Sequence, residues 1–206
     1  MAGDTKERIL DAALELFAQR GYLGTSMSDI AGRLDITKGA LYKHYASKQE
    51  ILGSIVERMD EMDEERAYEH GMPAADAEGS ARTYAVTSIE RIRAYSRAQF
   101  DHWTKDGFAS NFRKVLTLEQ YRDPELARLY QDRLAFGPVE YMAEVFQEVA
   151  ASKEDSLQLA LEFYGPLFLL YSVYDGAQDK ESISRLVDGH VDRFVQYLEA
   201  RRVDAK

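Results

Sequence analysis

Apolar residues recur at intervals of three and four over most of the chain, which is the spacing of amphipathic helices. The clearest such stripe is made of Ile9, Ala12, Ala13, Leu16 and Phe17. Gly21 follows it and predicts the end of the first helix. No segment alternates apolar and polar residues for long, and the chain has only four prolines. We therefore predict an all-α protein of about nine helices.

Two helix starts follow within the first 50 residues, at Ser26 and Ser47, each with an acid three positions later. This S-x-x-D/E pattern is a capping box. Between them Thr37 can cap a short helix over residues 38–45. Asp35 in "RLDIT" tolerates a left-handed backbone, and Ile36 can enter the small core. Three compact helices with a tight turn before the third predict a helix-turn-helix.

The rest of the chain predicts further helices. The fourth runs to about residue 69, and another is expected over residues 79–104, followed by a break at "KDGFAS" and a short helix at "NFRKVLTLEQY". Asp123 can cap the next helix, with Pro124 at its first position. The last two helices are expected at about 156–175 and 181–201. The Gly-Pro pairs at 137–138 and 165–166 lie inside helical runs, where they either bend the helix or form a joint that moves.

Charge is distributed unevenly between two parts of the chain. The formal net charge is -10, which by itself argues against binding to phosphates. Residues 1–50 carry seven basic and seven acidic side chains, so the whole excess of acid lies after residue 50. This segregation of charge indicates two parts of the chain with different functions.

The short third helix has the chemistry of a DNA-reading element. From Ile36 to Gln49 the chain holds three lysines and one histidine and no carboxylate. The helix start can bind a phosphate, the small side chains allow the backbone to approach base edges, and the polar side chains can contact phosphates. The residues predicted to do so are Thr37, Lys38, Gly39, Ala40, Tyr42, His44 and Lys48. The alternative for each residue is a cap or an ordinary solvated position.

The segment from Thr5 to Leu52 resembles the DNA-binding domain of the TetR family of transcriptional regulators, through "RILDAALELFAQRGY", "TSMSDIA", "TKGALYKHY" and "SKQEIL". The resemblance implies that Ser28 also faces DNA and that Leu41 and Tyr45 anchor the third helix inward. It further implies a homodimer with an N-terminal helix-turn-helix DNA-binding domain over residues 1–47. The larger helical domain over residues 48–206 would then be a ligand-binding and dimerisation domain that binds a small molecule and releases DNA. His44 stands where tyrosine is common, which puts one phosphate contact in doubt and could make affinity sensitive to pH.

The last two helices carry apolar stripes that either close the core of one protomer or meet a second copy as a four-helix bundle. We favour the interface, because two operator half-sites require a dimer. Its predicted residues are Leu161, Tyr164, Phe168, Tyr171, Leu186, Val187, His190, Val191 and Phe194.

Aromatic residues concentrate in the middle of the chain. For any single one core packing is the simpler explanation, but together they suit an apolar or aromatic ligand between helices. The candidate ligand-binding residues are Tyr84, Phe100, Trp103, Phe108, Phe112, Tyr121, Tyr141 and Phe163.

Other function classes have little support. The sequence has no cysteine, no G-x-S-x-G elbow, no phosphate-binding glycine loop and no closely spaced histidine pair, so we expect neither an enzyme nor a metal or cofactor site. The longest apolar stretch is too short to cross a membrane, and the N-terminus lacks a signal-peptide pattern, so we expect a cytoplasmic protein.

We therefore predict a repressor released from a palindromic operator by a small hydrophobic or aromatic effector of unknown identity. Binding of the effector would move the fourth helix and change the spacing of the two recognition helices. The alternatives are an activator or a DNA-binding protein without an effector.

Overall fold

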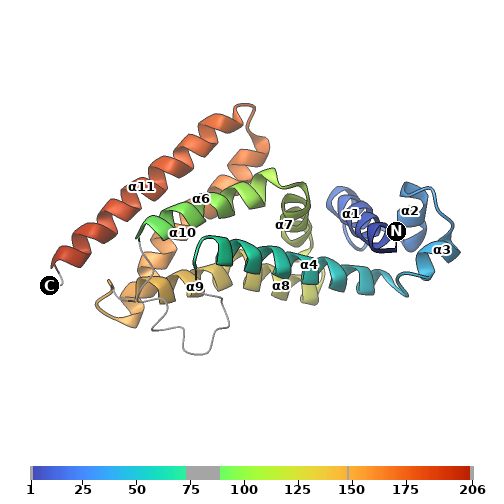
Figure 1. Cartoon of the computed structure of the whole chain (residues 1–206), viewed down its shortest axis with the longest axis horizontal. Helices are drawn as coiled ribbons and strands as arrows, with labels where there is room; N and C mark the ends of the chain where they lie inside the picture. Colours follow the sequence, from blue (N-terminus) through green and yellow to red (C-terminus); the bar gives the residue numbers. More distant parts are fainter. Residues whose placement is uncertain (1, 73–88, 148, 205–206) are drawn as a thin grey trace. The chain divides into compact units, whose positions relative to one another are not determined.

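The structure is a computed structural model that describes residues 2–72, 89–147 and 149–204. Those residues contain ten helices and no strand, so the predicted all-α class is confirmed (Figure 1). The helices are α1 (Ala2–Arg20), α2 (Met27–Arg33), α3 (Lys38–Tyr42), α4 (Lys48–Glu69), α6 (Ile89–Lys105), α7 (Gly107–Glu119), α8 (Pro124–Leu134), α9 (Phe136–Phe146), α10 (Lys153–Gly176) and α11 (Lys180–Asp204).

Several helix boundaries differ from the sequence-based ones for local reasons. Helix α3 ends at Tyr42, earlier than expected. The predicted break at "KDGFAS" is confirmed but is only one residue long: α6 ends at Lys105, and Asp106 caps α7 by accepting from the N–H of Ala109 at 2.9 Å. A new helix begins at Phe136, so the pair 137–138 lies in its first turn. Of the helix expected over residues 79–104, the part before residue 89 lies outside the described residues.

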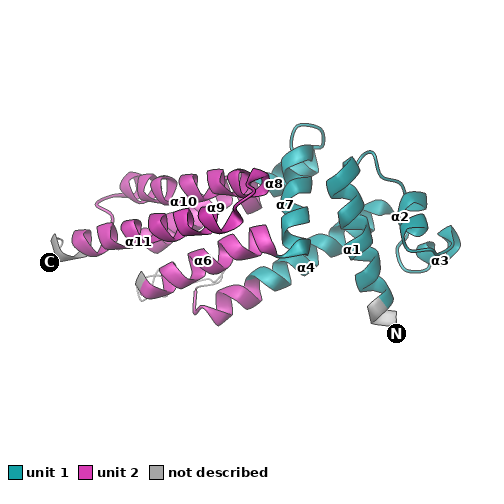
Figure 2. Ribbon diagram, turned by 90° about the horizontal axis from the view of Figure 1, so that it is seen from above, with its two compact units in different colours: residues 1–63, 106–130 teal, residues 64–105, 131–206 magenta. Residues whose placement is uncertain are grey.

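The chain divides into two compact units (Figure 2). Unit 1 comprises Met1–Asp63 and Asp106–Tyr130, and unit 2 comprises Glu64–Lys105 and Gln131–Lys206. Unit 1 therefore holds α1 to α3, most of α4, α7 and the start of α8. Helix α7 belongs with the N-terminal helices although residues 70–106 separate it from the end of α4. These compact units do not test the predicted division of function at residue 47, which stays a prediction.

The core of unit 1 forms where α1 packs against α2 and α7. The predicted stripe on α1 is confirmed, because all five of its residues are buried. Phe17 lies with its ring edge-to-face on Tyr22, the centroids 5.0 Å apart. The other fully buried side chains include Ile30, Leu41, Ile51, Ile55 and Phe112, so every helix from α1 to α4, and α7, contributes to one apolar core.

Unit 2 is a helical bundle in which α10 packs against α6, α9 and α11, and α6 also packs against α11. Its core is rich in aromatic rings, with Phe163 4.8 Å from Phe194 and 5.6 Å from Phe146 between centroids. Two arginines of α6 face two aspartates of α11: Arg97 Nε lies 2.7 Å from Asp188, and Arg93 Nε lies 3.1 Å from Asp192. These pairs fix the register of α6 along α11.

Candidate nucleic-acid interface

The turn between α2 and α3 has the geometry of a Schellman motif. Asp35 has φ 53, the left-handed conformation that its short side chain tolerates. The N–H of Ile36 donates to Ala31 O at 3.1 Å, and the N–H of Asp35 donates to Gly32 O at 3.3 Å. Thr37 then caps α3, its hydroxyl accepting from the N–H of Ala40 at 3.1 Å. Hydrogen bonds within residues 31–40 therefore set the direction in which α3 leaves α2.

Helix α3 is anchored on one side and open on the other. Leu41 is fully buried and Tyr45 is 4 % exposed, so the inward positions expected from the family resemblance are confirmed as buried. On the opposite side Thr37, Lys38, Gly39 and Tyr42 are exposed, and Ala40 and His44 are half-buried. A Cβ added to Gly39 would meet no atom within 4 Å, so the helix presents a low, open surface there. Such a surface can enter a major groove.

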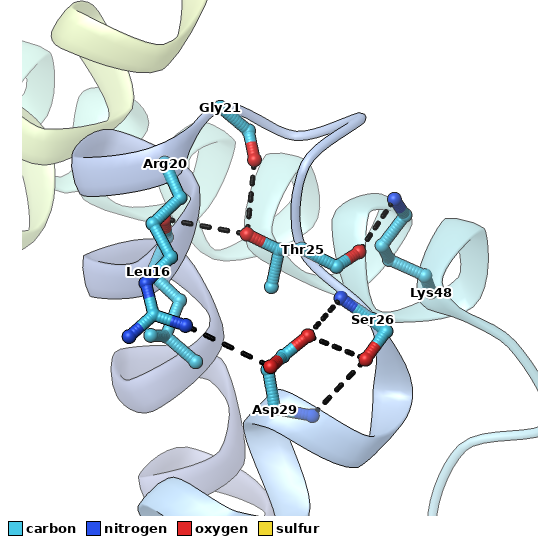
Figure 3. A network of polar contacts seen from close by, with 7 residues as sticks. All are labelled: Leu16, Arg20, Gly21, Thr25, Ser26, Asp29 and Lys48. Carbon is cyan, nitrogen blue, oxygen red and sulfur yellow. Dashed lines mark hydrogen bonds and ion pairs between the residues drawn. The ribbon is translucent and has the colours of Figure 1, made fainter.

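Helix α2 is fixed at its start by the predicted capping box (Figure 3). The N–H of Ser26 donates to Asp29 Oδ2 at 2.8 Å, and the N–H of Asp29 donates to Ser26 Oγ at 3.2 Å. The Ser26 hydroxyl also donates to the Asp29 carboxylate, and Arg20 lies 3.7 Å from its other oxygen. Hydrogen bonds from the Ser26 side chain and backbone lower the pKa of Asp29 below its ordinary value. Ser28, in the first turn of α2, is exposed.

The second capping box is present in a modified form. The hydroxyl of Ser47 accepts from the N–H of Glu50 at 3.1 Å, as predicted. The Glu50 carboxylate, however, accepts from the N–H of Ala46 at 2.5 Å, one residue before the cap. The Ser47 side chain therefore caps the first turn of α4, and the Glu50 side chain reaches back to the backbone just before the helix.

The side chain of Lys48 is directed toward the α1–α2 turn and not toward solvent. Its ammonium donates to Thr25 O at 2.8 Å (Figure 3) and to Tyr22 O at 2.5 Å, and it lies 4.2 Å from the centroid of the Tyr22 ring. Burial lowers the pKa of Lys48, and the charge of Glu119 acts in the opposite direction. Thr25 is itself buried, with its hydroxyl 2.9 Å from Gly21 O. Lys48 thus holds the α1–α2 turn.

Two residues that the sequence analysis did not single out also hold this unit together. Glu119, at the end of α7, accepts from the N–H of Tyr22 at 2.9 Å. Arg58 of α4 lies 2.8 Å from Glu7 and 3.0 Å from Asp11 on α1, and its guanidinium is 4.0 Å from the ring centroid of Phe108 on α7. Both contacts join residues at least 47 positions apart, so no local pattern indicates them.

The residues predicted for the dimer interface separate into three groups by their exposure. Leu161, Phe168 and Leu186 are exposed, at 45 %, 37 % and 54 %. Tyr164 and His190 are half-buried: Tyr164 donates to Leu134 O at 2.7 Å, and His190 Nε2 lies 2.8 Å from Phe163 O. The others, Tyr171, Val187, Val191 and Phe194, are buried inside the protomer. A second copy could therefore cover mainly the first group.

The candidate ligand-binding residues do not form one cluster. Phe100, Trp103 and Phe163 are buried and Tyr141 is half-buried, all in unit 2, where Phe100 stacks on Tyr171 at 5.4 Å between centroids. Phe108 and Phe112 are buried in unit 1. Tyr121 is 88 % exposed, and Tyr84 lies outside the described residues. Sequence pattern identified buried aromatics here but not which of them lie together.

Across residues 2–72, 89–147 and 149–204, no group of three or more His, Asp or Glu side chains is arranged to hold a metal ion. None of the helices in those ranges is both long and apolar enough to span a membrane.

A helix-turn-helix with an open, acid-free recognition helix, within an all-α chain, defines a DNA-binding protein of the helix-turn-helix class. Residues 9–55 match the family model "Bacterial regulatory proteins, tetR family". Among curated relatives, the negative transcriptional regulator IcaR of Staphylococcus epidermidis is 44% identical over 52 residues, which cover 25% of this chain and 28% of IcaR. The match thus spans little more than a quarter of that relative's length.

Solved structures resemble the chain over nearly its full length. AibR in complex with isovaleryl coenzyme A and operator DNA has a TM-score of 0.62 at 24% identity, covering 89% of this chain and 96% of AibR. The SmeT–triclosan complex has a TM-score of 0.63 at 20% identity, covering 94% and 91%. At these identities the likeness shows the fold. Residues 9–55 thus form a DNA-binding domain of the tetR family of bacterial regulatory proteins, and the chain has the all-α fold of these solved structures.

Proposed function

We propose that the chain is a homodimeric repressor that binds a palindromic operator and is released from it by a small hydrophobic or aromatic effector. The observation that carries the DNA-binding part is the geometry of α3, which the Schellman turn directs away from the core and whose open side is free of carboxylates. In this proposal the DNA-facing residues are Ser28, Thr37, Lys38, Gly39, Ala40, Tyr42 and His44.

Dimerisation is supported by the exposed apolar side chains of α10 and α11. Leu161, Phe168, Leu169, Val173, Leu186 and Tyr197 are each at least 37 % exposed. Large exposed apolar patches mark sites of interaction with other proteins, so these side chains are candidates for a surface that a second copy covers. A symmetric pair of α10 and α11 would form a four-helix interface and place two α3 helices about 34 Å apart, the spacing of successive major grooves.

The effector is proposed to bind among the aromatic residues of unit 2, near Phe100, Trp103, Tyr141 and Phe163. The structures of AibR with isovaleryl coenzyme A and of SmeT with triclosan give two cases in which proteins of this fold hold ligands with apolar groups. Helix α4 runs continuously from Lys48 in unit 1 to Glu69 in unit 2, so it can transmit a change. An effector can shift DNA affinity only by its own preference between the two states.

A mobility-shift titration on DNA upstream of the protein's own gene tests the proposal. We expect specific binding that Lys38→Ala with Tyr42→Ala weakens strongly, because both side chains lie on the open side of α3. The matched control is Lys153→Ala with Tyr68→Ala, which removes the same residue types from exposed positions elsewhere. Equal binding to scrambled DNA, or equal effects of the two double variants, would reject the proposed operator binding.

The effector step has its own experiment. Hydrophobic and aromatic compounds that raise the melting temperature are added to the protein–operator complex. We expect at least one class of binders to lower operator affinity. Binders that stabilise the protein and leave operator affinity unchanged would reject the release mechanism and leave operator binding intact.

A further inference from the structure

One residue of the α1–α2 turn, Tyr22, is held between two opposite charges that come from different helices. Its N–H donates to Glu119 Oε1 at 2.9 Å, and its carbonyl accepts from Lys48 Nζ at 2.5 Å. Its ring lies under the same ammonium, 4.2 Å from Nζ to the centroid. All three residues belong to unit 1. The backbone N–H and the carbonyl of Tyr22 thus each make a charge-assisted hydrogen bond, which is stronger than a hydrogen bond between neutral groups.

Burial of the Glu119 carboxylate in this arrangement is unfavourable for the stability of the protein. Glu119 is 0% exposed, and among the described residues no hydrogen-bond partner faces its Oε2. Arg122 lies 4.0 Å from Oε1, but its side chain is 64% exposed. Burying an incompletely paired charge destabilises a protein, and such groups are retained in some systems because they specify one geometry. Glu119 therefore calls for a role beyond packing.

The turn itself is shaped around this carboxylate. Gly21 has φ 81, which favours glycine, and a Cβ placed on it would lie 2.5 Å from Glu119 Oε1. The turn then continues through Thr25, whose carbonyl accepts the second hydrogen bond from Lys48 at 2.8 Å. Ser26, the cap of α2, follows directly. The position of the turn therefore sets where α2, and with it α3, begins.

We propose that Glu119, Tyr22 and Lys48 form a clamp that positions the helix-turn-helix for operator binding, with Glu119 and Lys48 acting as positioning residues. This inference rests on the proposed function. In this arrangement Lys48 positions the α1–α2 turn and does not make the phosphate contact expected from sequence. Its ammonium instead contacts two backbone carbonyls and the Tyr22 ring. Since Lys48 begins α4 and Glu119 ends α7, displacement of either helix acts on Tyr22.

The salt dependence of operator binding separates a positioning lysine from a phosphate-binding one. Each phosphate contact that is lost lowers the slope of log affinity against log salt by about one. We expect Lys48→Met to weaken operator binding about tenfold with the slope unchanged, since it removes part-buried charge-assisted hydrogen bonds and no phosphate contact. Lys38→Met is the matched variant and is expected to lower the slope. A reduced slope in Lys48→Met would overturn the clamp.

The carboxylate is tested with two variants of nearly equal size. Glu119→Met removes the acceptor, and we expect about tenfold weaker operator binding and faster hydrogen exchange at the Tyr22 amide. Glu119→Gln keeps an acceptor opposite that amide, so we expect it to restore protection and to stay within about threefold of wild-type affinity. Glu61→Gln, an exposed change on α4, controls for charge. The loss of operator-binding free energy in the double variant Glu119→Met with Lys48→Met should be smaller than the sum of the losses in the two single variants.

The outcomes separate the clamp from the function on which it rests. Loss of Tyr22 protection with operator affinity unchanged, or fully additive effects of the two single variants, would overturn the positioning role and leave operator binding standing. Absence of any operator preference in the wild-type protein would overturn the proposed function, and the positioning role with it. Circular dichroism of each variant establishes that the helices are retained.

Discussion

Arg58 is the side chain through which α4 is tied to both α1 and α7, and replacing it gives the most quantitative test of how unit 1 is held together. Its guanidinium lies 2.8 Å from Glu7, 3.0 Å from Asp11 and 4.0 Å from the ring centroid of Phe108. The arginine side chain is 29% exposed and the two carboxylate side chains are more than half exposed. Arg58→Met keeps the apolar stem and removes the charge.

The magnitude follows from these three contacts. Ion pairs with exposed carboxylates contribute about 0.5 kcal/mol each after screening. A cation over a buried ring contributes about 1 kcal/mol. We therefore expect Arg58→Met to lower the free energy of unfolding by about 2 kcal/mol at low salt. Arg33→Met is the control, since Arg33 makes one exposed ion pair, with Glu15, and we expect a loss of about 0.5 kcal/mol or less.

Urea unfolding followed by circular dichroism, at low salt and at high salt, measures both variants. At about 1 M salt the screening length is about 3 Å, so the ion-pair part should vanish and the loss should fall to about 1 kcal/mol. A loss below about 0.5 kcal/mol at low salt would refute the role of Arg58 as a tie. A loss that salt leaves unchanged would show that packing, and not charge, holds α4 to α1.

Further outcomes are expected from other parts of the structure. Leu161→Asp with Leu186→Asp should yield a monomer in analytical ultracentrifugation, whereas Leu118→Asp, at a leucine that is 48% exposed in unit 1, should leave the dimer intact; unchanged mass in the first variant would exclude this face as the interface. Thr25→Val should cost about 1 kcal/mol in urea unfolding, because the hydroxyl bonded to Gly21 O is lost. The folded-state pKa of Asp29 is lowered, so its stabilisation is present above the ordinary value of 3.8 and is lost as pH falls through the folded pKa. The melting-temperature difference between wild type and Asp29→Asn should therefore shrink below that pH, and a constant difference would contradict this assignment.

The sequence predicted well those features whose partners are close along the chain. The Ser26–Asp29 box, the Thr37 cap and the left-handed Asp35 each depend on residues within five positions, and all three are present. The burial of Leu41 and Tyr45 also agrees with expectation. Local hydrogen bonding therefore makes the recognition helix predictable from sequence.

Features that depend on distant partners could not be predicted in the same way. Glu119 meets Tyr22 across 97 positions, and Lys48 meets Thr25 across 23. Hydrophobic periodicity shows which residues share a helix face but not what covers that face. For this reason the pattern on α11 predicts an interface stripe that includes Val187 and Val191, whereas both side chains are buried within the protomer.

The central claim is that α3 reads DNA as one of two copies held a fixed distance apart. A hydroxyl-radical footprint on the DNA upstream of the gene tests it most directly. We expect two protected segments on one face of the duplex, separated by about 34 Å, with both lost together in the Lys38→Ala and Tyr42→Ala double variant. A single protected segment, or protection that this double variant retains, would contradict the claim.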